Sequence, residues 1–173
     1  MKFCDMPYER IDVKAATAAL DAAAEHLAGA KTLGEAEAAF EEREKIITHV
    51  HTMSTIAYIR HTVNTLDEFY EKENDFNDEN APLIEQSEQK FTEAMLSSPL
   101  RPQLEEKYGK LIFVNAELSR KCFSPEIIPD LQEENRLSSE YQKLIASAQI
   151  EFGGKTLSLA QLGAYKENSE RII

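Results

Sequence analysis

The chain has 173 residues with 42% hydrophobic and 29% charged side chains, a balance typical of one soluble domain with its own core. Its formal net charge of −12 argues against nucleic acid and anionic membranes as partners, because both attract clustered Lys and Arg. No run approaches the roughly 20 apolar residues of a membrane span, and no apolar signal segment follows the first residues.

Two cysteines, Cys4 and Cys122, stand without any disulfide or metal motif around them. Cys122 lies in an apolar stretch, so we expect it to be a small buried side chain. Together with the lack of a signal segment, this cysteine usage favours a reduced protein of the cytoplasm.

Two helices are predicted early in the chain, each with its own cap. Asp12 can cap a helix whose apolar residues recur every three or four positions as far as Gly29. Thr32 and Glu35 then form a T-x-x-E capping box, and from Leu33 a new apolar stripe begins.

The stripe that starts at Leu33 meets no proline before Pro82. A second T-x-x-E pair, Thr65 and Glu68, allows a break near Asn64, so this region forms one long helix or two. The charged run "EKENDFNDEN" lacks the spacing of a calcium loop and is expected to be a solvated face or loop. We expect another helix to follow Pro82.

The next segments also predict helices, which are shorter. "RPQLEEKYGK" predicts a short helix closed by Gly109, and a further helix follows it. Ser124 can cap another helix with Pro125 at its first position. The last substantial helix is expected to open at Ser138.

The stretch "SAQIEFGGKTLSLAQL" predicts a β-hairpin in a chain otherwise rich in helix formers. Gly153 and Gly154 can supply the positive φ angles of a two-residue turn. That turn fixes three cross-strand pairs: Ile150 with Leu157, Glu151 with Thr156, and Phe152 with Lys155.

After the hairpin, Ser158 and Gln161 form an S-x-x-Q cap for a final turn that Gly163 is expected to end. Taken in chain order, the elements predict a mainly α fold. It consists of long antiparallel helices with one short β-hairpin near residues 148–159.

No catalytic or metal-ligating residue can be assigned from motifs. The four histidines show neither H-E-x-x-H nor E-x-x-H spacing, and His49 and His51 point to different sides of a helix. A G-x-S-x-G elbow, a C-x-x-C pair and a glycine-rich phosphate loop are also missing from the sequence. Each histidine is therefore expected to be a polar surface or interhelical residue.

One polar constellation is a candidate peptide-contact site. On a continuous helix, polar side chains spaced seven, three and four residues apart would form one strip: Ser54, His61, Asn64 and Glu68. Arg60 would border this strip. Such a strip could hydrogen-bond a peptide backbone. The alternative is a solvated or interhelical polar face without a ligand.

Three long segments resemble the N-terminal part of oligoendopeptidase F-type zinc metallopeptidases, a family related to thimet oligopeptidase. They are "MKFCDMPYER", "IRHTVNTLDEFYEKEND" and "SPEIIPDLQEENRLSSEYQKLIASAQIEFGGKTLSLAQLG". The resemblance runs from residue 1 to about residue 170. It implies a large helical enzyme that cleaves short peptides, in which these N-terminal helices form one wall of the cleft.

In that family the zinc ligands lie on a downstream H-E-x-x-H helix, which has no counterpart here. The resemblance therefore implies zinc and short peptides for the complete enzyme, but no cofactor and no catalytic residue in this chain. We expect residues 1–173 to be the N-terminal helical region without the catalytic zinc domain, and inactive alone. Family members begin another long helix where this sequence ends, and Asn168 or Ser169 is the expected cap of that helix.

A second hypothesis is a free-standing helical module that binds peptides or another protein. Under the first hypothesis, the isolated chain exposes apolar surface and is expected to self-associate through it. The sequence leaves both hypotheses open.

Overall fold

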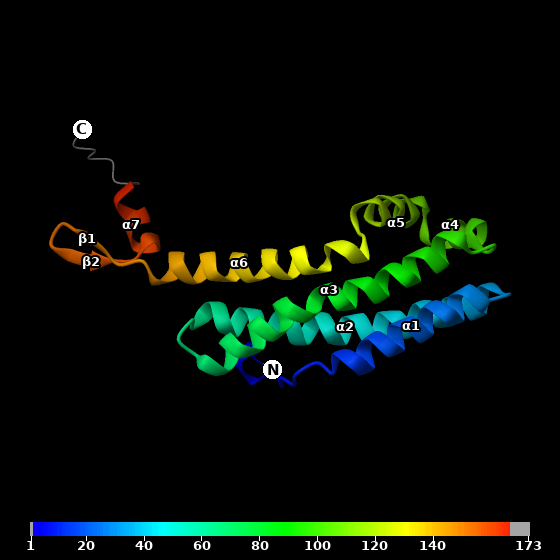
Figure 1. The fold of residues 1–173 in the computed structure, drawn as a ribbon, viewed down its shortest axis with the longest axis horizontal. Helices are drawn as coiled ribbons and strands as arrows, with labels where there is room; N and C mark the ends of the chain where they lie inside the picture. The colour runs from blue at the N-terminus through cyan, green and yellow to red at the C-terminus, as the bar shows by residue number, and fades with distance from the viewer. Residues whose placement is uncertain (1, 167–173) are drawn as a thin grey trace.

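A computed structural model describes residues 2–166 and confirms the mainly α fold (Figure 1). Three long helices, α1 (Val13–Gly29), α2 (Leu33–Val63) and α3 (Glu68–Ser97), pack along one another as the body of the molecule. The core of the body is rich in alanine, and these small side chains let the helix backbones approach closely. Its buried apolar residues include Leu20, Ala23, Ala24, Leu27, Ala36, Ala39, Ile47, Val50, Ile84, Phe91 and Met95.

The first helix starts are the predicted ones. Asp12 accepts a hydrogen bond from the backbone N–H of Ala15 at 2.9 Å, which caps α1. Thr32 and Glu35 form the full capping box at the start of α2. The reciprocal hydrogen bonds satisfy backbone N–H groups that a helix start otherwise leaves unpaired.

The break between the second and third helices lies at Asn64, as the sequence allowed. The N-terminal cap of α3 is Asp67, whose carboxylate accepts hydrogen bonds from the N–H groups of Phe69 and Tyr70. Thr65 is therefore not the cap. The run expected to be a solvated face or loop is helical, and it contributes the buried Glu73 to the body.

The predicted break at Pro82 is wrong, because α3 continues through this proline. A proline inside a helix leaves the carbonyl four residues earlier without its usual donor. Here that carbonyl belongs to Asp78, and it accepts from Asn135 Nδ2 at 3.0 Å instead. The neighbouring carbonyl of Glu79 accepts from Gln132 Nε2 at 2.7 Å. Side-chain amides of a later helix thus supply donors where Pro82 cannot.

The second half of the chain adds shorter helices and the hairpin. Gly109, with φ 86°, forms the corner between two of the helices. The elements are α4 (Arg101–Tyr108), α5 (Lys110–Cys122), a 3-10 turn (Pro125–Ile127), α6 (Ile128–Ser147), β1 (Ile150–Phe152), β2 (Lys155–Leu157) and α7 (Leu159–Lys166).

Three smaller expectations are corrected. α6 runs on through Ser138 from Ile128, because prolines are tolerated in the first turn of a helix. α7 continues past Gly163, where an isolated glycine weakens a helix without ending it. Cys122 is exposed rather than buried, since it is the last residue of α5 and lies beyond the side chains that α5 buries.

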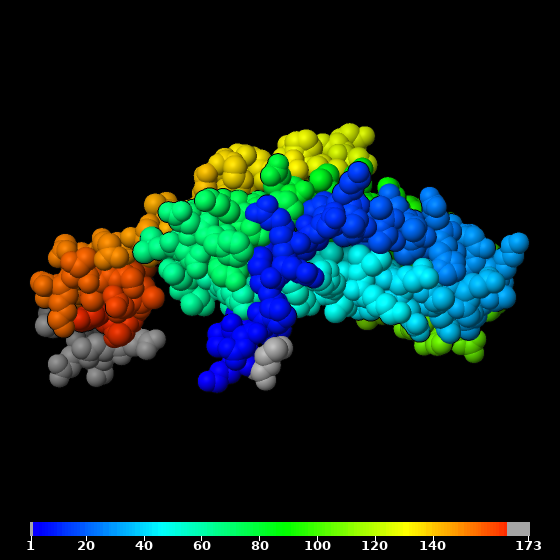
Figure 2. Space-filling model, turned by 90° about the horizontal axis from the view of Figure 1, so that it is seen from below, coloured from blue at the N-terminus to red at the C-terminus, as the bar shows by residue number. Residues whose placement is uncertain are grey.

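The hairpin has the predicted register, and both turn glycines have positive φ angles of 58° and 72°. Ser158 and Gln161 exchange the expected cap hydrogen bonds at 2.8 and 3.3 Å. Figures 1 and 2 show the hairpin and α7 at one end of the molecule, beyond the α2–α3 turn. The expected caps Asn168 and Ser169 lie outside the described residues.

Candidate functional site

The five residues of the predicted strip do not lie on one helix. α2 ends at Val63, so Asn64 lies in the turn and Glu68 opens α3. The assumption of a single helical face is therefore wrong. The individual side chains have different surroundings.

Arg60 holds the N-terminal segment against the body. Its Nη2 donates to the carbonyl of Met6 at 2.7 Å and contacts those of Phe3 and Cys4, while Nη1 donates to Tyr70 Oη. The guanidinium also lies 5.8 Å from the Phe3 ring centroid. These contacts indicate that Arg60 stabilises the fold by joining the N-terminal segment to α2 and α3.

The other members of the strip range from buried to exposed. His61 is only 3% exposed, and its Nδ1 has no hydrogen-bond partner among residues 2–166. Asn64 and Glu68 are exposed, and Asn64 Oδ1 accepts from the N–H of Leu66 at 3.3 Å. Ser54 is half-buried and lines a groove.

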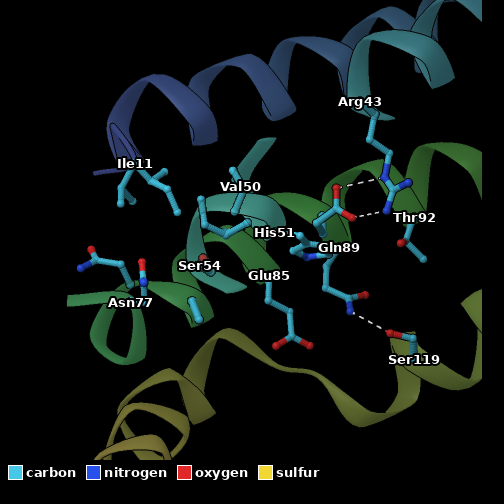
Figure 3. A pocket seen from close by; sticks show the side chains of 15 residues that line it. Ile11, Arg43, Val50, His51, Ser54, Asn77, Glu85, Gln89, Thr92 and Ser119 are labelled. Atoms are coloured by element: carbon cyan, nitrogen blue, oxygen red, sulfur yellow. Dashed lines mark hydrogen bonds and ion pairs between the residues drawn. The ribbon is translucent and has the colours of Figure 1, made fainter. Parts of the chain in front are cut away.

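This groove is a cavity of about 500 Å³ between α2 and α3 (Figure 3). Three buried apolar side chains, Ile11, Val50 and Ile84, belong both to the groove lining and to the hydrophobic core beneath. Polar side chains from α2 and α3 complete the lining, and Ser119 of α5 borders one end. The groove therefore combines an apolar floor with hydrogen-bonding groups, as small-ligand sites do.

One end of the groove is closed by paired side chains. Arg43 Nε donates to Glu88 Oε1 at 3.0 Å, and Arg43 forms a second bond to the same carboxylate. Gln89 Nε2 donates to Ser119 Oγ at 3.1 Å. Both contacts are drawn as dashed lines in Figure 3. Further along the groove lie four other polar side chains: His51, Ser54, Asn77 and Glu85.

Asp78, beside Asn77 on α3, belongs to the contact with α6. Its Oδ2 accepts from Ser139 Oγ at 2.5 Å and from Asn74 Nδ2 at 3.0 Å. Burial raises the pKa of the Asp78 carboxyl, and the nearby Asp75 adds to this. The Ser139 hydrogen bond and the positive charge of Lys143 act in the opposite direction but do not outweigh burial.

No pattern in the sequence combines His51, Asn77 and Glu85. Asn77 and Glu85 are eight positions apart and share a face of α3 only because the helix passes Pro82. The expected break there had assigned them to separate elements.

Residues 2–166 contain no group of three or more His, Cys, Asp or Glu side chains placed to hold a metal ion, so they do not fit a zinc site. His49 lies 3.5 Å from Glu9 while His51 lines the groove, so the two point to different sides. None of the described helices has an apolar stretch that could cross a bilayer.

Residues 3–123 match the family model described as the Peptidase M3 N-terminal domain. No curated protein matches the chain. Among solved structures, PZ peptidase A with an inhibitor is 42% identical and superposes with a TM-score of 0.92 over 96% of this chain.

Two further structures are equally similar. A protein assigned as oligoendopeptidase F, from crystals grown by microfluidic seeding, is 40% identical with a TM-score of 0.93 over 97% of this chain. Another, assigned likewise, from Bacillus anthracis str. Ames, is 39% identical with a TM-score of 0.91 over 95%. This chain spans 30% of the length of each of the three.

Proposed function

Since this chain belongs to the family of Peptidase M3 N-terminal domains, we propose that it forms the N-terminal wall of a peptide-hydrolysing cleft. The observation that carries the proposal is the match to PZ peptidase A. It covers 96% of this chain but only 30% of that peptidase, at a TM-score of 0.92. A piece of this kind contributes surface to a larger enzyme, while the remaining 70% supplies the rest of the active site.

Bond cleavage is assigned to the remainder of such an enzyme. Residues 2–166 lack a fitting metal donor set, so a zinc ion and its ligands belong elsewhere in the complete enzyme. The chain is then inactive alone and acts by shaping the cleft for short peptides in the cytoplasm. Ser54, Asn64 and Glu68 are accessible enough to contact such a peptide, whereas Arg60 and His61 support the surrounding fold.

The outer face of α6 supports the same role. Its apolar side chains repeat at helical spacing and are 40% to 67% exposed: Leu137, Tyr141, Leu144 and Ile145. Apolar side chains gathered on one face are typical of a surface that another part of a protein covers. Phe152 is also exposed, in the hairpin that follows the C-terminal end of α6. We assign this face to contact with the catalytic part.

A chimera tests the proposal. This chain replaces the matching N-terminal 30% of PZ peptidase A, and hydrolysis of a short fluorogenic peptide is measured. We expect kcat/KM within about tenfold of the parent, because the backbone match preserves the wall. The chain alone, with zinc added, should show no chelator-sensitive hydrolysis. A matched chimera carrying Tyr141→Glu and Leu144→Glu should lose activity if α6 contacts the catalytic part.

A folded but inactive chimera, or chelator-sensitive hydrolysis by the chain alone, would contradict the proposal. The alternative of a free-standing interaction module would then gain support. The exposed α6 face also leads us to expect self-association of the isolated chain. Light scattering after size exclusion should give a mass above the 19.6 kDa of one chain, and the double Glu variant should lower it. A wild-type mass of one chain would refute that expectation.

A further inference from the structure

The groove between α2 and α3 contains polar side chains that the protein leaves without partners. Other polar side chains are paired, as Arg43 with Glu88 at one end of the groove and Asp78 with Ser139 beside it. Within residues 2–166, five polar groove side chains form no hydrogen bond to another residue: His51, Ser54, Asn77, Glu85 and Thr92. Figure 3 shows Thr92 near Arg43, whereas Asn77 lies toward the opposite end of the groove.

Among these side chains, Asn77 has a buried polar atom without a partner within residues 2–166. Its Nδ2 is buried and donates to nothing in the described chain. A buried amide N–H without an acceptor destabilises the folded state, so native proteins nearly always give it a partner. A carbonyl oxygen entering the groove would be such an acceptor.

Glu85 adds a preference for positive charge. Arg43 is the cationic side chain in the lining, and both its bonds go to Glu88. Glu85 is exposed and forms no ion pair with the described residues. The net charge of −12 adds a field of the same sign. An ammonium group is therefore the complementary ligand group at Glu85.

The floor specifies the remaining chemistry. Ile11, Val50 and Ile84 offer an apolar surface in the same groove as the amide of Asn77 and the carboxylate of Glu85. A ligand that matches these side chains carries an apolar group, a carbonyl and an ammonium. The volume of about 500 Å³ accommodates a few amino-acid residues.

We propose that this groove binds a short peptide, with an apolar side chain on the floor, a backbone carbonyl at Asn77 and an ammonium group at Glu85. The ammonium is either the free amino terminus or a Lys side chain. The choice of a peptide rests on the proposed function. The site itself rests on the unpaired groups and the charge of the groove, so it can be tested without catalysis.

The experiment measures binding of three labelled peptides to the intact 173-residue chain by fluorescence anisotropy. One is acetylated and contains Leu-Lys, one has a free amino terminus and contains Leu-Gln, and the third is acetylated with Leu-Gln. We expect at least one ammonium-bearing peptide to bind about tenfold more tightly than the third. Which of the two binds more tightly identifies the source of the ammonium.

Glu85→Gln should weaken the preferred peptide about tenfold and remove its advantage over the third peptide. Glu106→Gln is the matched control, since it makes the same charge change at an exposed carboxylate outside the groove. Circular dichroism checks that both variants fold. Equal binding of all three peptides, no binding, or equal effects of the two variants would overturn the inference.

The outcome is separable from that of the chimera. Glu85-dependent binding with an inactive chimera would support the groove and sink the cleft-wall proposal. An active chimera without Glu85-dependent binding would do the reverse.

Discussion

Helices α1 and α6 both pack against α3, but by different physical means. α1 buries Leu20, Ala23, Ala24 and Leu27 between its neighbours. The 20-residue α6 buries none of its residues and turns an apolar face to the outside. Burial stabilises α1 without directional requirements, whereas α6 depends on individual bonds, each with a modest net contribution of about 0.5–1.5 kcal/mol.

Those bonds are spread along the contact between α3 and α6. Ser139 bridges Asp78 and Asn74, and Lys143 Nζ donates to Glu71 Oε1 at 2.9 Å. The Lys143 hydrogen bond lowers the pKa of the Glu71 carboxyl. The comparison shows that a helix can be positioned by its polar face while its apolar face is left for another partner.

The largest expected difference comes from matched leucines on the two helices. Leu27→Ala in α1 should lower the free energy of unfolding by about 3 kcal/mol, because it leaves a cavity in the core. Leu144→Ala in α6, where the side chain is 67% exposed, should change it by less than about 0.5 kcal/mol. Urea denaturation followed by circular dichroism measures both. Similar losses would contradict the division between the two helices.

The second prediction concerns a polar contact between the N-terminal segment and α3. Arg10 Nε donates to both oxygens of the buried Glu73 at 3.1 and 3.0 Å, and Tyr8 Oη donates to the same carboxylate at 2.7 Å. Arg10→Ala should lower the free energy of unfolding by about 1–2 kcal/mol, because it leaves the buried Glu73 carboxylate without its cation. The loss stays modest because Arg10 itself is half exposed. Arg10→Lys should recover part of the loss in the same urea experiment.

This contact also has a pH signature. The Arg10 hydrogen bond lowers the pKa of the Glu73 carboxyl. Its contribution to stability is present above the unfolded pKa of about 4.3 and is lost as pH falls through the folded pKa. The wild type should therefore lose stability on acidification more steeply than Arg10→Ala. Parallel pH profiles would count against the assignment.

A smaller effect is expected where Asn135 donates to the carbonyl of Asp78. Asn135→Ala should lower the free energy of unfolding by about 1 kcal/mol, because it removes that donor. In a Pro82→Ala background the new N–H of residue 82 can bond the same carbonyl, so Asn135→Ala should then cost less. A double-mutant cycle in urea gives the coupling energy. A coupling of zero would show that Asn135 does not substitute for the missing helix bond.

The smallest effect is a pH dependence under α6 that runs opposite to that of Glu73. Burial raises the pKa of Asp78, so its contribution is fully present below the unfolded pKa and is lost as pH rises through the folded pKa. Asp78→Asn does not titrate, and its stability relative to wild type should increase from about pH 4 toward neutrality. Glu106→Gln is the exposed control. A constant difference across this range would contradict the expectation.

Local signals in the sequence were enough for most of the elements. Asp12 and the Thr32–Glu35 box mark helix starts because they satisfy N–H groups within a few residues. The Gly153–Gly154 turn determines the hairpin register for a similarly local reason. The family resemblance was also confirmed, because it rested on long segments.

What could not be predicted depends on distant residues. Nothing near Pro82 reveals that Asn135 will supply a donor 53 positions after it, so the helix through Pro82 was missed. The groove likewise joins His51 to Glu85 across two helices whose relative rotation follows from core packing. Cys122 has apolar neighbours in sequence but lies past the part of α5 that faces the core.

Pro82 finally has a bearing on the alignment of α6 along α3. Helices packed through apolar ridges can often shift against each other and repack. Moving α6 by one helical turn would carry Asn135 about 5.4 Å from the carbonyl it bonds. The carbonyl that Pro82 leaves without a helix donor therefore favours one alignment of α6 along α3. Because the hairpin follows α6, the same alignment determines how far the hairpin extends past the α2–α3 turn.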